Sequence, residues 1–107
     1  MARVVALVPD LMLASRVEAT LAGAGHEVTV DSGRPPEAIA DAELIVADVG
    51  ELDPALVVKR GTPVLGFYRH TDVQKRRRAE AAGVDVVVPR SRLARELPEL
   101  VEQLLGS

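Results

Sequence analysis

The amino-acid sequence predicts an α/β fold in which helices cover both faces of a parallel β-sheet. Five short segments are rich in β-branched residues and are the expected strands: 4–8, 27–30, 44–47, 63–68 and 84–88. The first, third and fifth are almost continuously apolar, which is typical of strands buried on both faces of a parallel sheet. Segments with helical patterns separate the strands. Short right-handed crossovers then favour a doubly wound, five-stranded, flavodoxin-like sheet of order 2-1-3-4-5 in a three-layer αβα domain.

The first two helices are expected over residues 11–24 and 35–42. Residues 11–24 have an apolar stripe at helical spacing, formed by Leu13, Val17, Leu21 and Ala24. Gly25 follows as the stop signal. The second helix opens with two prolines, which suit a first helical turn.

The third and fourth helices have recognisable end signals. An Asp-Pro pair predicts a third helix over residues 54–60, which Gly61 ends. Thr71 or Asp72 can cap a fourth helix, which ends before Gly83.

The last helical segment opens at Ser91 and carries an apolar stripe of leucines and one valine. Pro98 lies inside it and lacks the backbone N–H that a helix interior needs. We therefore expect the regular helix to begin only near residues 95–97.

Composition limits the class of protein. The chain has 107 residues, of which 48% are hydrophobic but only 2% aromatic, namely Phe67 and Tyr68. The length predicts one domain, residues 1–107 without an output domain, with an aliphatic core that includes Phe67. The absence of cysteine excludes a disulfide scaffold and a thiolate zinc site.

Charge and hydropathy predict the surroundings of the protein. No apolar run approaches the roughly 18 residues that span a bilayer, and the N-terminal apolar run is too short for a signal peptide. We expect a cytoplasmic protein with no membrane partner. The net charge of −3 also makes a nucleic-acid partner unfavourable.

Polar residues follow the expected strands, at the edge of the sheet where ligands bind in this class of fold. Asp48 ends the third strand, and four further residues form a candidate pocket rim: Asp10, Tyr68, Arg90 and Ser91. Strand ends also need solvated residues for purely structural reasons, so the cluster has a plain alternative reading.

The chain resembles the receiver domains of two-component response regulators over nearly its whole length. The resemblance rests on the segments AGAGHEV, LIVAD, TPVLGFY and AAGVDVVVPRS. It implies a flavodoxin-like signalling domain in which Asp48, at the end of LIVAD, stands at the phosphoacceptor position. It also implies a dimer surface formed by the fourth helix, fifth strand and fifth helix.

The sequence departs from the family at its motifs. Val8 and Pro9 stand where the family has two acidic residues that hold Mg²⁺. Tyr68 replaces a small hydroxyl residue, Arg90 replaces a lysine, and Ser91 replaces the following proline. Without the acidic pair, little Mg²⁺ is available to neutralise the charge of phosphoryl transfer. The departures predict a degenerate pseudo-receiver without a metal or other cofactor.

Two carboxylates remain near this site. Asp10 could supply one Mg²⁺ ligand only if its loop were re-aimed. Arg90 could pair with Asp48 and hold the site closed without phosphate. Phosphorylation of Asp48 in a working regulator stays as a further alternative.

Two charged stripes form a candidate interaction face for a protein partner or a homodimer. The fourth and fifth expected helices supply Lys75, Arg76, Arg77, Arg78, Glu96, Glu99 and Glu102. The alternative is a solvated helix whose arginine stems cover apolar surface.

Enzyme motifs are absent: the sequence has no glycine-rich phosphate loop and no GxSxG elbow. His26 is expected at the wrong end of the sheet, and His70 is alone on a loop. We expect a stand-alone, non-enzymatic receiver-like domain that acts by protein contact. The alternative from another class is a small-molecule or nucleotide binder that uses the pocket around Asp48.

Overall fold

The computed structural model describes residues 2–31, 39–69 and 72–106, and these form a five-stranded parallel sheet. The strands are β1 (Arg3–Leu7), β2 (Glu27–Asp31), β3 (Leu44–Asp48), β4 (Val64–Tyr68) and β5 (Val86–Pro89). Their order is β2-β1-β3-β4-β5, and every neighbouring pair is parallel. The predicted strands and their order are confirmed, with ends that shift by one or two residues.

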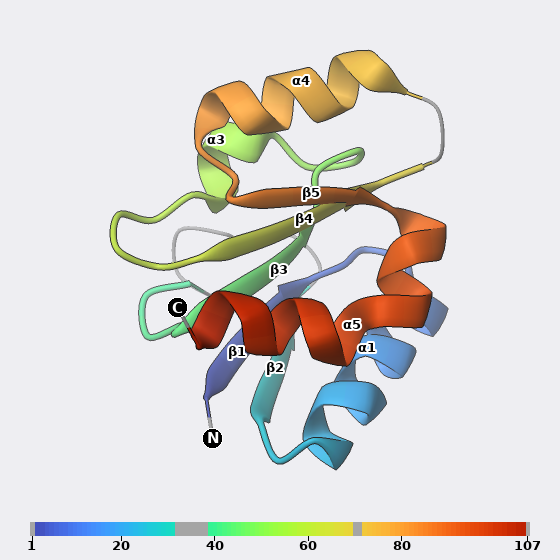
Figure 1. Ribbon diagram of the computed structural model, residues 1–107, viewed down its shortest axis with the longest axis vertical. Helices are drawn as coiled ribbons and strands as arrows, with labels where there is room; N and C mark the ends of the chain where they lie inside the picture. The colour runs from blue at the N-terminus through green and yellow to red at the C-terminus, as the bar shows by residue number, and fades with distance from the viewer. Residues whose placement is uncertain (1, 32–38, 70–71, 107) are drawn as a thin grey trace.

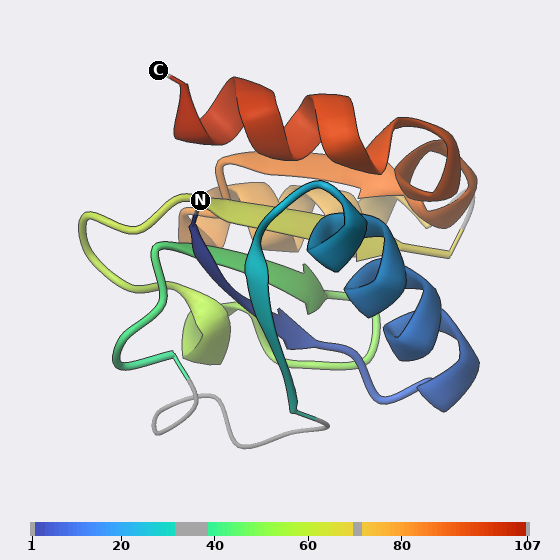
Figure 2. The same ribbon diagram turned by 90° about the horizontal axis from the view of Figure 1, so that it is seen from below.

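Helices cover the two faces of the sheet. They are α1 (Leu11–Gly23), α3 (Pro54–Val57), α4 (Val73–Ala82) and α5 (Arg90–Leu105). α1 and α5 lie on one face, whereas α3 and α4 lie on the other (Figures 1 and 2). Among the described helices, none is long and apolar enough to cross a membrane.

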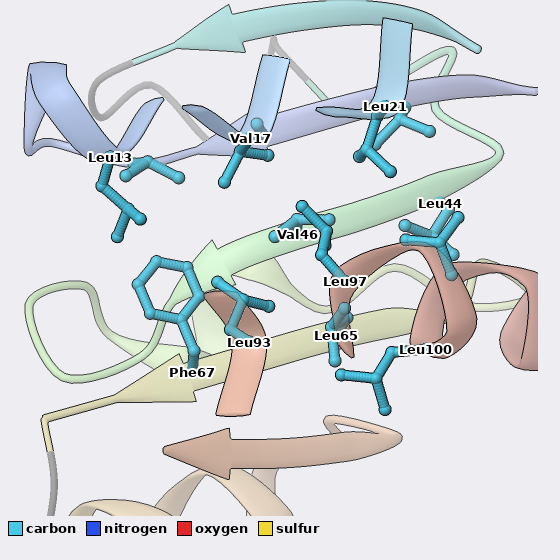
Figure 3. Packing of buried hydrophobic residues seen from close by; sticks show 14 of the residues in the cluster. Leu13, Val17, Leu21, Leu44, Val46, Leu65, Phe67, Leu93, Leu97 and Leu100 are labelled. Atoms are coloured by element: carbon cyan, nitrogen blue, oxygen red, sulfur yellow. The ribbon is translucent and has the colours of Figure 1, made fainter. Parts of the chain in front are cut away.

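Each face of the sheet has its own apolar core. The first core packs α1 and α5 on the sheet and contains most of the large side chains, including Phe67, which is 1% exposed (Figure 3). The second core packs α3 and α4 on the other face and contains Tyr68. Successive side chains of a strand point to opposite faces, so the two neighbouring aromatic residues enter different cores.

The strands differ in burial. All five residues of β3 and all five of β4 are buried, as expected for central strands of a parallel sheet. β2 lies at the edge and has no buried residue.

The second and third predicted helices differ from the structure. Of the expected helix 35–42, residues 35–38 lie outside the described part of the chain, and residues 39–41 form a turn. The third helix ends at Val57 instead of residue 60, because Val58 is extended, with φ −90° and ψ 132°. Lys59 and Thr62 then form an antiparallel bridge around a turn in which Gly61 has φ 83°.

The end signals of α4 are confirmed at Asp72 and Gly83. The Asp72 carboxylate accepts a hydrogen bond from the Lys75 backbone N–H at 3.3 Å, and Gly83 has the left-handed φ of 104°. Thr71, the other expected cap, lies outside the described residues.

The expected start of α5 near residues 95–97 is wrong, because the helix begins at Arg90 and continues through Pro98. Pro98 cannot donate to the carbonyl of Ala94. Ala94 is exposed, so water can bind that carbonyl instead. Burial of Leu93, Leu97 and Leu100 on both sides of the proline outweighs the missing bond.

Candidate functional site

The ends of the parallel strands bring the residues selected from the sequence to one edge of the sheet. Asp48 is paired in register with Phe67, and Tyr68 is paired with Pro89, directly before Arg90. Asp10 follows the loop after β1 and begins α1.

Asp48 is almost completely buried, with 7% of its surface exposed. Its Oδ1 accepts hydrogen bonds from the backbone N–H groups of Gly50 at 3.0 Å and Glu51 at 3.2 Å. Burial raises the pKa of the Asp48 carboxyl, because the charged form loses hydration, and the two backbone hydrogen bonds only partly oppose this effect.

Gly50 closes the turn over this carboxylate. A Cβ at position 50 would lie 3.3 Å from Asp48 Oδ1 and 3.7 Å from Tyr68 Cα. The backbone of the turn therefore lies close against the end of β4, which leaves little space beside the Asp48 oxygen.

Asp10 has both of its carboxylate oxygens in use. Oδ1 accepts hydrogen bonds from the backbone N–H groups of Met12 at 3.0 Å and Leu13 at 3.1 Å, which caps α1. Oδ2 accepts a hydrogen bond from Arg90 Nη2 at 2.5 Å. The hydrogen bond from Arg90 is the largest cause that lowers the pKa of Asp10.

The suggested pairing of Arg90 with Asp48 is wrong, because the guanidinium pairs with Asp10 instead. Arg90 acts on Asp48 only as a weak, more distant charge. Asp10 starts the helix that packs beside α5, so its side chain is close to the start of α5, whereas Asp48 is held by its own turn.

The residues present do not fit the Mg²⁺ site that this fold would imply. Val8 is fully buried and offers no oxygen ligand, and the Asp10 carboxylate already caps α1 and pairs with Arg90. Across residues 2–31, 39–69 and 72–106, no three His, Asp or Glu side chains come together in a way that could hold a metal ion.

Tyr68 lies in the second core instead of on a pocket rim. The residue is only 5% exposed and belongs to the apolar cluster under α3 and α4.

A cleft of about 700 Å³ opens beside Asp10, between the first turn of α1 and the start of α5. Its lining includes three predicted rim residues, Asp10, Arg90 and Ser91, but neither Asp48 nor Tyr68. It also includes Arg69, which the sequence places among the polar residues after the fourth strand, and Arg16, which sequence reasoning did not select. Nothing in the sequence marks Arg16, because it lies within a helix and not at a strand end.

The basic side chains of α4 are partly neutralised by neighbouring carboxylates. Lys75 lies 3.9 Å from Asp72, Arg76 lies 3.5 Å from Glu80, and Arg78 lies 3.8 Å from Asp53. Arg77 is exposed and forms no ion pair with the residues that the structure describes.

The acidic side chains of α5 also have different surroundings. Glu96 pairs with Arg92 at 3.2 Å, and Glu99 is exposed. Glu102 lies 3.4 Å from His26, whose Nδ1 accepts a hydrogen bond from the Ala2 backbone N–H at 3.2 Å. Glu102 therefore reaches the β2 edge of the sheet, whereas α4 packs along β5 at the opposite edge.

Comparisons by structure identify the fold. No family model and no curated protein matches the sequence. A response regulator from Thermotoga maritima is similar, with a TM-score of 0.81 and 18% identity, over 100% of this chain and 99% of that one. A response regulator receiver protein from Burkholderia phymatum is also similar, with a TM-score of 0.80 and 16% identity, over 99% and 96% of the two chains.

NtrX from Brucella abortus, solved in complex with ADP, has a TM-score of 0.82 and 17% identity. The match covers 98% of this chain but 27% of NtrX, so the chain spans about a quarter of that protein's length. These similarities show that the chain has the fold of response regulator receiver domains.

Proposed function

We propose that the chain is a receiver-like signalling domain that acts through protein–protein contacts and is not switched by Mg²⁺-dependent phosphorylation of Asp48. The observation that carries the proposal is the hydrogen-bonded ion pair between Asp10 and Arg90. It engages the Asp10 carboxylate, which follows directly after the positions where receivers hold Mg²⁺, and the basic residue that would otherwise contact a phosphoryl group.

The surroundings of Asp48 support the same proposal. Its carboxyl is buried, one oxygen accepts two backbone hydrogen bonds, and burial raises its pKa. A phosphoryl group would add up to two negative charges at a site that already disfavours one. Without a metal ion, Arg90 supplies only a weak opposing charge at this site among the described residues.

The contact surface that we favour is the outer side of α4, for a partner protein with an acidic surface. α4 buries only Ala79, and its basic side chains point largely to solvent. Arg77 has no described ion-pair partner, and ion pairs between exposed side chains are weak enough to exchange for contacts with another protein. A homodimer through α4, β5 and α5 is the second form of this proposal.

Phosphorylation is tested by incubating the protein with acetyl phosphate and Mg²⁺ and measuring its intact mass, with Asp48→Asn as the matched control. We expect no phosphorylated species in either protein. A phosphoryl adduct that forms on the wild type and not on Asp48→Asn would overturn the proposal and favour a phosphorylated regulator.

The contact surface is tested by charge reversal of Arg76, Arg77 and Arg78 to Glu. The matched control reverses Arg3, Arg16 and Arg60, which are exposed and lie outside α4, β5 and α5. We expect the α4 variant alone to lose the partner recovered in a pull-down. Size-exclusion chromatography of the purified protein with light scattering tests the homodimer. A mass that stays monomeric as the protein concentration rises contradicts it.

A further inference from the structure

The cleft between α1 and α5 has a chemical character that protein contact through α4 does not explain. Its lining carries three arginines, Arg16, Arg69 and Arg90, against one carboxylate, Asp10. The formal charge of the lining is therefore +2, although the whole chain carries −3. The three guanidinium groups come from α1, the end of β4 and the start of α5, so the fold concentrates them at one place.

Two of these arginines have no counter-ion in the described part of the chain. Neither Arg16 nor Arg69 forms an ion pair with the residues that the structure describes, and both are exposed. Arg90 donates one hydrogen bond to Asp10, which leaves further N–H donors of its guanidinium group. The cleft therefore presents many unused donors and uncompensated positive charge.

The cleft is also partly apolar. Met12 lines it and is 82% exposed, and Leu13 and Ala94 contribute further apolar surface. An exposed methionine is a flexible apolar surface that adapts to a bound organic group. A volume of about 700 Å³ lies within the range of small-molecule sites.

We infer that this cleft binds an organic polyphosphate of nucleotide size, with its phosphates on Arg16, Arg69 and Arg90 and its organic part against Met12. Guanidinium groups bind phosphate oxygens through paired hydrogen bonds. Several arginines therefore suit a ligand with several negative charges better than a ligand with a single carboxylate. α5 also begins without a side-chain cap, so the backbone N–H groups of its first turn, beside Ser91, have no side-chain acceptor. This binding function goes beyond the proposed protein contact and uses neither Asp48 nor α4.

The test is isothermal titration with ATP, inorganic tripolyphosphate and adenosine as three separate probes, in EDTA and at fixed ionic strength. We expect saturable binding of ATP, weaker binding of tripolyphosphate, and no detectable binding of adenosine. The Arg16→Gln and Arg69→Gln variants should each bind ATP about tenfold or more weakly, which is the effect of losing a hydrogen bond between charged groups. Arg77→Gln on α4 is the matched control, with the same change of net charge, and should bind ATP as the wild type does.

Met12→Ser tests the organic part separately. It should weaken the binding of ATP and leave the binding of tripolyphosphate unchanged, because only ATP has an organic group that contacts the methionine. Absence of saturable ATP binding would overturn the inference. Equal losses of ATP affinity for Arg77→Gln and Arg16→Gln would overturn it as well, since they would indicate non-specific charge attraction. All four substituted side chains are exposed, so circular dichroism should show unchanged folding.

Discussion

Arg90 and Asp10 are separated by 80 positions in the sequence, yet their side chains form a hydrogen-bonded ion pair that joins the first turns of α5 and α1. The same carboxylate caps α1 through its other oxygen. One side chain thus fixes a helix start and connects two helices.

Substitutions of Asp10 should separate these two roles. Asp10→Asn keeps an oxygen that can cap α1 but removes the charge, whereas Asp10→Ala removes both. We expect the urea midpoint of unfolding to fall in the order wild type, Asn, Ala. Equal midpoints for Asn and Ala would show that the cap contributes nothing.

The pH dependence of the Asp10 effect has a definite sign. The pKa of Asp10 is lowered in the folded protein, so its contribution to stability is present above the ordinary value of 3.8 and is lost as pH falls through the folded pKa. The stability difference between the wild type and Asp10→Asn should therefore shrink in acid below pH 3.8, as measured by urea unfolding at several pH values.

The effect of Asp48→Asn on stability should depend on pH in the opposite sense. The pKa of Asp48 is raised by burial, so the folded protein binds its proton more tightly than the unfolded chain, and charging it lowers stability as pH rises from 3.8 through the folded pKa. Asparagine keeps an oxygen for the Gly50 and Glu51 amides without the buried charge. We expect Asp48→Asn to be more stable than the wild type at pH 7, with the gain vanishing in acid. A destabilised variant at pH 7 would contradict this account.

Phe67→Ala should cost about 3–5 kcal/mol of unfolding free energy, because it leaves a large cavity in the core under α1 and α5. Chemical denaturation measures the loss. Leu11→Ala is a control, since Leu11 is 75% exposed, and should change stability by no more than about 0.5 kcal/mol.

Gly83→Ala should lower stability by about 1–2 kcal/mol, because the residue ends α4 with φ 104°, which an alanine adopts only with strain. The added Cβ itself meets only Val58 at an ordinary 3.5 Å. Gly23→Ala at the end of α1 meets no atom within 4 Å and has no positive φ, so it should be neutral or slightly stabilising. Thermal unfolding of the two variants compares the positions directly.

The sequence predicts those parts of the fold that local patterns determine. Buried strands can be recognised in the sequence as apolar runs, and Asp72 and Gly83 are end signals that act on their own helix. The start of α5 could not be predicted from the sequence. The local penalty of Pro98 competes with the burial of leucines of α5, and that burial exists only once the helix packs on the folded sheet. The ion-pair partner of Arg90 could not be predicted either, because the carboxylates of Asp10 and Asp48 both lie near this edge of the sheet. Only the packed positions of α1 and of the Asp48 turn decide which of them pairs with Arg90.

The unequal burial of the strands has a consequence for how the molecule opens. β4 supplies Phe67 to one core and Tyr68 to the other, so both layers depend on the same strand and should open together. β2 has no buried residue and can detach from the edge while β3 and β4 stay paired. Hydrogen exchange should therefore release the β2 amides through small local openings and the β4 amides only through global unfolding.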